Sequence, residues 1–286
     1  MSFEITTSFV NQFSSNVQML SQQQGSLFRN AVDSETITGE KAFFDQIGSV
    51  AASEREDRHT DTPIMDVPHA RRMVSMKDYH HNSLIDDQDK LRTLIDPTSS
   101  YAKAAANAMG RKMDDIIIKS LLGNALTGKT GSSTVGLPST QKIAHGSTGL
   151  TIAKLVEAKQ KLDEQSVDPS IRRYIAVSPK QISDLLNNTT VTSSDFNTVR
   201  SLATGSLTSF VGFDFIVSNR LTTDSNSNRQ VIAWAEDGCM LAVGKDVTAR
   251  IDERPDKSYA TQVYYCASFG ATRMEEVKVV EIACTE

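Results

Sequence analysis

The strongest hydrophobic pattern lies over residues 97–123, where apolar side chains recur every three or four positions. That spacing places them along one face of an α-helix. Asp96, Pro97 and Thr98 form a helix start signal, and Gly123 provides a stop. We therefore predict a helix of about 40 Å. Its apolar stripe consists of Tyr101, Ala105, Ala108, Met109, Met113, Ile116, Ile117 and Leu121.

A different pattern covers residues 39–82, where two partly apolar limbs, residues 41–50 and 63–76, flank a charged tip. Prolines and β-branched residues in the second limb disfavour a helix. The pattern predicts a long two-stranded excursion. An isolated ribbon of this kind is only marginally stable in water, so we expect it to rest on other surfaces. A flexible surface loop is the alternative that the composition leaves open.

The remaining segments predict an arm followed later by a mixed α/β region. Val10, Phe13, Val17 and Leu20 recur at helical spacing in a Ser- and Gln-rich stretch, so a short helix is expected to dock on the body or on a neighbour. A frayed terminus without function is the alternative. Residues 127–149 are predicted to form a loop. Helices are expected at residues 151–164 and 179–186, and strands at 174–177, 210–217, 230–235, 240–243, 247–253, 260–268 and 276–284.

Composition and charge narrow the possible functions. The 286 residues suggest one large domain or two modest ones, and the formal net charge of −5 argues against a broad basic face that grips DNA. Cys239, Cys266 and Cys284 lack C-x-x-C spacing and are expected to be reduced and mostly buried. We find neither a secretory signal nor a stretch of about 18 apolar residues, so a soluble protein is expected.

One segment, residues 123–130, matches the phosphate-loop pattern G-x-x-x-x-G-K-[ST]. Phosphate binding by such a loop needs a strand before it and a helix after it. Here a long helix comes first, and the Gly- and Pro-containing residues 131–138 do not begin a helix. We interpret the match as a helix stop followed by a flexible loop. A soluble nucleotide-binding α/β enzyme that uses Gly123–Thr130 is the alternative function of a different class.

Other catalytic patterns are absent from the sequence. The histidines have no i, i+4 pair typical of zinc sites, and no G-x-S-x-G nucleophile elbow occurs. Asp86-Asp87 and Asp114-Asp115 are adjacent, so on a helix the two carboxylates of each pair do not face each other. We predict no catalytic residue, no cofactor and no metal site, and therefore no enzyme.

Several blocks occur in a specific order between residues 70 and 125 and again between 260 and 286. Their landmarks are Arg71-Arg72, Asp78-Tyr79, Leu84-Ile85-Asp86-Asp87, Ile95-Asp96-Pro97, Gly110-Arg111 with Asp114-Asp115, and, near the end, Gly270-Ala271-Thr272-Arg273 followed by residues 277–284. Ile175 to Pro179 forms a weaker block between them. Together these blocks resemble the core signature of tailed-bacteriophage major capsid proteins with the Johnson fold.

The resemblance implies an α+β Johnson-type capsid fold. Its parts would be an N-terminal arm at residues 1–38, an extended loop (E-loop) at 39–82 and a peripheral domain at 83–149 and 246–286. The peripheral domain would contain β-strands and a spine helix at 97–123. An α/β axial domain at 150–245 would surround the local symmetry axes of hexamers and pentamers.

The implied function is that of a major capsid protein, which self-assembles into the icosahedral head shell around the phage DNA. An encapsulin-like shell of a cellular compartment is the alternative within the same fold. Expected partners are further copies of the chain, a separate scaffolding protein, a portal, and packaged DNA bound without sequence specificity; no membrane is involved. A separate scaffold is expected because no long charged helical extension precedes the arm. The expected location is the virion, after assembly in the bacterial cytoplasm.

The resemblance also nominates residues for contacts between subunits, where the arm and the excursion lie across a neighbour. They are Phe13, Val17, Glu54, Arg55, Glu56, Arg58, Arg71 and Arg72. Reversing the charges of Arg71 and Arg72 is expected to leave the subunit folded and to block assembly. Residues 51–67 contain no lysine, so we expect no covalent cross-link of the kind that some capsids form through a loop lysine.

Overall fold

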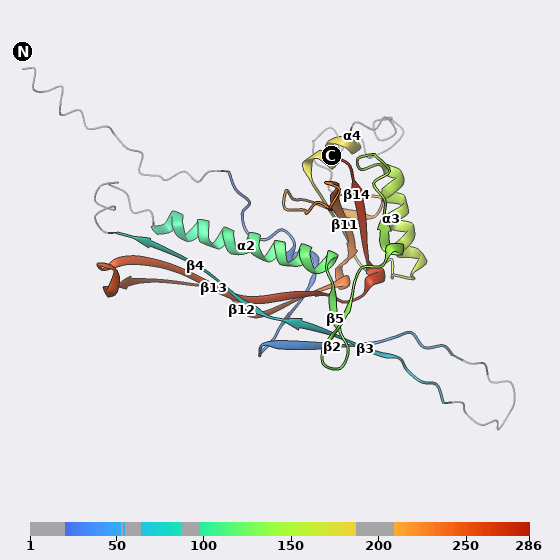
Figure 1. The fold of residues 1–286 in the computed structure, drawn as a ribbon, viewed down its shortest axis with the longest axis horizontal. Coiled ribbons are helices and arrows are strands. Elements are labelled where there is room, and N and C mark those ends of the chain that lie inside the picture. The colour runs from blue at the N-terminus through green and yellow to red at the C-terminus, as the bar shows by residue number, and fades with distance from the viewer. Residues whose placement is uncertain (1–20, 53, 55–63, 87–97, 187–208) are drawn as a thin grey trace, which may run out of the picture.

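The computed structural model describes residues 21–52, 54, 64–86, 98–186 and 209–286, which form an elongated mixed α/β subunit (Figure 1). Its strands make three sheets. One sheet lies along the long helix, a six-stranded sheet lies beside two shorter helices, and the third carries the excursion. In Figure 1 the excursion leaves one end of the molecule and the tip of the β12–β13 hairpin marks the other.

The long helix is α2 (Thr98–Leu122), as the apolar pattern predicts. It packs along a sheet of β1 (Asp33–Thr36), β12 (Cys239–Arg254), β13 (Ala260–Arg273) and β4 (Lys77–Ile85). Ala105, Met109, Met113, Ile117 and Leu121 are buried as expected. Tyr101 is 46% exposed, so the buried stripe begins one turn later than predicted.

Strand β12 corrects one expected break in the chain. The sequence predicts separate strands at residues 240–243 and 247–253, because small and charged residues lie between them. The structure has one strand of 16 residues, with register shifts against β13 between Val243 and Lys245 and between Lys245 and Thr248. A β-bulge absorbs the intervening residues and lets the strand continue.

The six-stranded sheet has the order β7 (Lys142–Ile143), β14 (Val279–Cys284), β11 (Arg229–Ala235), β8 (Arg173–Val177), β10 (Phe213–Val217) and β9 (Ser209–Phe210). Helix α3 (Ile152–Glu164) packs on it, and α4 (Pro179–Leu186) follows β8, both near the predicted positions. The expected strand over 210–217 is instead a hairpin, since Val211 and Gly212 adopt positive φ angles of 54° and 83° and form its turn.

The last strand joins parts of the chain that are distant in sequence. β14 pairs with β11 and β7, although the resemblance groups residues 246–286 with the spine helix. The boundaries of the four parts therefore stay a prediction. Trp234 on β11 belongs to the core that the six-stranded sheet shares with the sheet along α2. Its ring is fully buried and stacks with Phe28 and Tyr174, and its Nε1–H donates to the Ala31 carbonyl at 2.8 Å.

Candidate inter-subunit interface

The excursion begins as an antiparallel pair, β2 (Lys41–Ile47) and β3 (His69–Ser75), which confirms the two-stranded prediction over these residues. Alternate side chains of β2 are exposed, among them Phe43 and Ile47. Six of the thirteen large hydrophobic side chains that are exposed in the described chain lie on the excursion. They are Phe43, Ile47, Val50, Ile64, Met65 and Val67, with exposed fractions from 41% to 96%. Clustered apolar exposure of this kind marks an interaction surface.

The base of the excursion is fixed to the body by polar contacts. Arg72 Nε and Gln46 Nε2 both donate to the Met274 carbonyl, each at 2.8 Å. Arg72 also forms an ion pair of 2.6 Å with Glu276. Because Arg72 is only 7% exposed, this pair is largely shielded from water and holds the returning strand in place.

Residues 273–276, which include the partners of Arg72 at Met274 and Glu276, also contact the spine helix. Arg273 is fully buried and donates to the carbonyls of Leu121 and Gly123, at 2.8 and 2.7 Å, where α2 ends. Its second terminal nitrogen donates to the Val135 carbonyl at 3.0 Å. A cation that satisfies the unpaired carbonyls at a helix C-terminus is also favoured by the helix dipole. Residues 273–276 therefore set the direction of the excursion relative to α2.

The outer face of the excursion carries an exposed charge pair. Arg71 Nε lies 2.5 Å from Asp45 Oδ1, and the Arg71 guanidinium sits 5.5 Å from the centre of the Phe43 ring. The hydrogen bond from Arg71 lowers the pKa of Asp45, and the same bond raises the pKa of Arg71. Both groups are in water in the isolated subunit, so the pair is free to take part in a contact with a neighbour.

The end of the N-terminal arm docks on the spine helix. The fully buried carboxylate of Asp114 accepts hydrogen bonds from the Gln23 amide and the Ser26 hydroxyl, both at 2.5 Å, and from the backbone N–H of Leu27 and Phe28. The arm crosses α2 at Gly110, where a Cβ atom would lie 2.3 Å from the Gly25 carbonyl carbon. A side chain at position 110 would displace the arm.

The structure places the predicted contact residues in different surroundings. Arg71 and Glu54 are exposed or partly exposed on the excursion, where a neighbour could reach them. Arg72 lies inside the subunit with partners from its own chain, so reversal of its charge is now expected to disturb folding. Phe13, Val17, Arg55, Glu56 and Arg58 lie outside the described residues. A contact of any of these residues with a neighbour remains a prediction.

Sequence reasoning did not find the anchoring residues Gln46, Arg273, Glu276 and Asp114. Arg273 belongs to a block that carries the resemblance, but its partners are backbone carbonyls far away in sequence. Asp114 stands beside the buried Met113 on a helix that buries its apolar stripe. A carboxylate in that position needs hydrogen-bond partners. Its place on the helix was therefore the signal in the sequence that could have identified Asp114 as an anchoring residue.

The phosphate-loop match does not form a phosphate-binding loop. After Gly123, β5 (Ala125–Thr127) and β6 (Ser133–Val135) make a hairpin that pairs with β3, so the order is helix, strand, turn, strand. Gly128 and Gly131 take positive φ angles of 92° and 69° in the turn. The helix stop at Gly123 is confirmed, but the predicted flexible loop is wrong, because these residues extend the sheet of the excursion.

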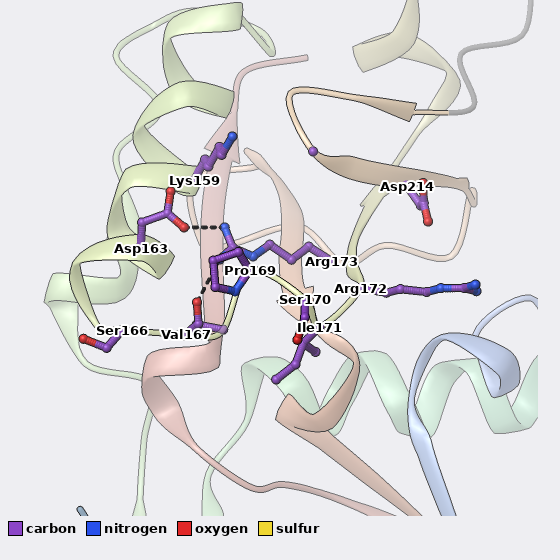
Figure 2. Close-up of a pocket in the computed structure, with 11 residues that line it drawn as sticks. Lys159, Asp163, Ser166, Val167, Pro169, Ser170, Ile171, Arg172, Arg173 and Asp214 are labelled. Carbon is purple, nitrogen blue, oxygen red and sulfur yellow. Dashed lines mark hydrogen bonds and ion pairs between the residues drawn. The ribbon is translucent and has the colours of Figure 1, made fainter.

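A hollow of about 750 Å³ lies between α3, the turn after it and β10 (Figure 2). Arg173, on its lining, pairs with Asp163 at 2.7 Å and donates to the Val167 carbonyl at 3.0 Å. The lining contains neither His nor Cys. The contacts of Arg173 thus stabilise the turn between α3 and β8.

Other sites can be assessed over the described part of the chain. No group of three His, Cys, Asp or Glu residues there is placed to hold a metal ion, and none of its helices is both long and apolar enough to cross a membrane. All three cysteines are free thiols. Burial raises the pKa of Cys239 to about 12 and that of Cys284 to about 11. Cys266 is partly exposed, so it alone departs from the expected burial.

Known proteins resemble this chain over nearly its whole length. A family model described as phage capsid protein matches residues 5–286. A search of curated protein sequences gives no significant match. Among solved structures, the capsid of cyanophage P-SCSP1u is 17% identical, with a TM-score of 0.76 over 99% of this chain and 94% of its own. Mycobacterium phage Che8 is 15% identical, with a TM-score of 0.71 over 96% of this chain and 97% of its own. The capsid of Ralstonia phage GP4 is 11% identical, with a TM-score of 0.76 over 97% of this chain and 95% of its own.

These likenesses confirm the predicted capsid fold, with its spine helix and mixed α/β sheets. The family match extends over almost every residue, including the excursion and the segments that anchor it. The virion is therefore the setting in which the exposed excursion is to be understood, and the chain belongs to the phage capsid protein family.

Proposed function

We propose that this chain is the major capsid protein that assembles into hexamers and pentamers of an icosahedral head around the DNA of a tailed bacteriophage. The observation that carries the proposal is the excursion, which projects from the subunit with exposed apolar side chains and a rigid base. In a shell, each excursion would lie across a neighbouring subunit and bury these side chains. Stable assemblies of this kind bury roughly 2,000 Å² or more at each interface.

The proposal includes further partners for the chain and assigns it no catalytic activity. A separate scaffolding protein and a portal would direct closure in the bacterial cytoplasm, and the DNA would be enclosed without sequence-specific binding. The chain would have no enzymatic activity. The hairpin at Gly123–Thr130 and the hollow without His or Cys both support a purely structural role. No residue of 51–67 is a lysine, which supports subunits that are held together without covalent links.

Negative-stain microscopy of the purified chain, alone and with its scaffold, tests the proposal. We expect closed shells of uniform size. When they are boiled in detergent with reducing agent, they should release a single species near 31.3 kDa, the mass of the chain. A chain that stays monomeric at high concentration, even with scaffold, would refute the shell function. A ladder of covalent multimers would refute only the absence of cross-links.

A further inference from the structure

Lys154, in the first turn of α3, carries a buried charge that the proposed shell function does not use. The residue is only 7% exposed, although lysine is almost never buried without a partner for its charge. The hydroxyl of Thr151 caps the helix and accepts from the Lys154 backbone N–H at 3.4 Å. The dipole of the helix disfavours a cation at this end. The ammonium group of Lys154 therefore needs strong stabilisation from its surroundings.

Four backbone carbonyls provide that stabilisation, and we call them the carbonyl cage. Lys154 Nζ donates to the carbonyl oxygens of His145, Thr148, Gly149 and Ala283, at 2.8, 3.0, 2.9 and 3.0 Å. An ammonium group has three N–H donors, so the cage offers one more acceptor than the group has hydrogens. Backbone carbonyls that converge on one point can replace the hydration shell of a monovalent cation, as they do in potassium-selective filters.

The backbone around the cage brings these carbonyls together. β7 and β14 pair in parallel, so the loop after β7 and the end of β14 lie at the same edge of the sheet. In this loop, Gly146 and Ser147 take positive φ angles of 54° and 56°, and the chain reverses its direction. The Thr285 backbone N–H donates to the Thr148 carbonyl at 3.0 Å and closes the loop onto the end of β14. Because α3 lies beside β14 (Figure 1), Lys154 reaches both segments.

The carboxylates near the cage act on Lys154 at longer range. Asp184 is paired with Lys180 at 3.1 Å, and Glu157 is paired with Lys161 at 3.7 Å. Burial lowers the pKa of Lys154, as is expected for a cation that is removed from water. The direct partners of the charge are therefore the neutral oxygens of the cage. A site of this kind accepts a cation by its charge and size.

We propose that the carbonyl cage is a site for a monovalent cation of the size of potassium or ammonium, which Lys154 fills with a tethered ammonium group. The chain then fastens β14 to α3 without taking an ion from solution. Potassium and ammonium ions are close in size, so a cage that fits one fits the other. When the tether is removed, the cage should bind a free ion of this class. The proposal is independent of the proposed shell function, because it concerns the folding of a single subunit.

Lys154→Ala tests the cage, because the substitution removes the ammonium group and leaves room for an ion. In tetramethylammonium chloride, whose cation is too large for the cage, the thermal midpoint should fall by roughly 5 °C or more below that of the wild type. Potassium chloride or ammonium chloride at the same ionic strength should restore at least half of this loss, along a saturable curve. Lithium chloride should restore little, because this small ion holds its water tightly. The wild type should have the same midpoint in all four salts.

Two further variants provide matched controls. Lys154→Met keeps an uncharged side chain of similar length in the cage, so its midpoint should fall and should not respond to potassium. Lys161→Ala removes a lysine of the same helix that donates to one carbonyl, that of Thr140 at 2.8 Å, and its midpoint should not distinguish the cations. If either control responds to potassium as strongly as Lys154→Ala does, the response is a general effect of salt and the proposal is overturned.

Hydrogen exchange measured by mass spectrometry locates the effect in the chain. In Lys154→Ala without potassium, peptides that cover residues 145–149 and 283–286 should exchange faster than in the wild type, and potassium should restore their protection. A variant that folds only with potassium or ammonium present would support the proposal just as well. Failure to fold in every salt, a midpoint equal to that of the wild type without potassium, or equal midpoints in all four salts would overturn it.

Discussion

The six-stranded sheet and the excursion use the same kinds of side chain in opposite surroundings. Ile175 and Ile232 in the sheet are completely buried, whereas Ile47 and Ile64 on the excursion are 70% and 96% exposed. Full burial of an isoleucine side chain contributes about 1.5–3 kcal/mol. The sheet gains this free energy when the chain folds, whereas under the proposed shell function the excursion would gain it only when the chain associates. The proposal therefore separates residues that stabilise the subunit from residues that would hold the shell together.

The largest effect on folding is expected in the core between the six-stranded sheet and the sheet along α2. Trp234→Ala removes a fully buried ring stacked with Phe28 and Tyr174, and also removes its hydrogen bond to Ala31. The free energy of unfolding should fall by about 3–5 kcal/mol, as measured by urea denaturation. Ile47→Ala is the control on the excursion and should change it by less than about 0.5 kcal/mol. Equal losses of unfolding free energy in the two variants would contradict the distinction between the core and the excursion.

Two adjacent arginines test the boundary between the regions. Arg72→Gln removes the 2.6 Å ion pair with Glu276, which then keeps only the longer 3.7 Å pair with Arg273, and should cost about 3 kcal/mol of unfolding free energy. Arg71→Gln removes only exposed interactions, the pair with Asp45 and the contact with the Phe43 ring, so its thermal midpoint should match that of the wild type. Thermal denaturation of both variants by circular dichroism measures the difference. A stable Arg72 variant would show that the excursion is not anchored through residue 276.

Acid should weaken the contact that joins the last residue of the chain to β11 of the six-stranded sheet. The hydrogen bond from Arg229 lowers the pKa of Glu286 to about 2, below its ordinary value of 4.5. A lowered pKa in the folded state means that the stabilisation is complete above about pH 4.5 and is lost as the pH falls toward 2. The thermal midpoint of Glu286→Gln should therefore depend less on pH over this window. Parallel curves for wild type and variant would show that this carboxylate is not linked to folding.

The smallest effect is expected in the hairpin between β5 and β6. Lys129 is exposed in a turn that does not cradle phosphate, so Lys129→Ala should leave shell yield unchanged. Calorimetric titration of the wild type with ATP should show no binding at millimolar concentration. An affinity for ATP that this substitution abolishes would restore the nucleotide-binding alternative.

Local patterns predicted much of the fold because they report local physics. The apolar spacing and the stop at Gly123 gave α2 to within a residue or two, and the alternating limbs of the excursion gave β2 and β3. The sequence patterns did not predict the turn at Val211 or the bulge near Lys245, because each depends on a backbone conformation that the neighbouring side chains do not indicate.

The interface was only partly predictable for a different reason. Charge and exposure of the excursion follow from its sequence, but the partners of Arg72 and Asp114 come from 86 to 204 residues away in the chain. Arg71 and Arg72 look alike in sequence, yet alternation along β3 places one outside and the other inside. Only the fold distinguishes a residue that contacts a neighbour from one that anchors the subunit.

The central claim is that the exposed apolar face of the excursion holds the shell together and does not stabilise the subunit. Ile47→Ser with Ile64→Ser tests it, and Val156→Ser on α3, where the side chain is 50% exposed, is the matched control. Sedimentation velocity with scaffold present should show shells for the wild type and the control. The double variant should sediment as a folded, unassembled subunit with the wild-type unfolding midpoint. Closed shells at wild-type yield from the double variant would contradict the account.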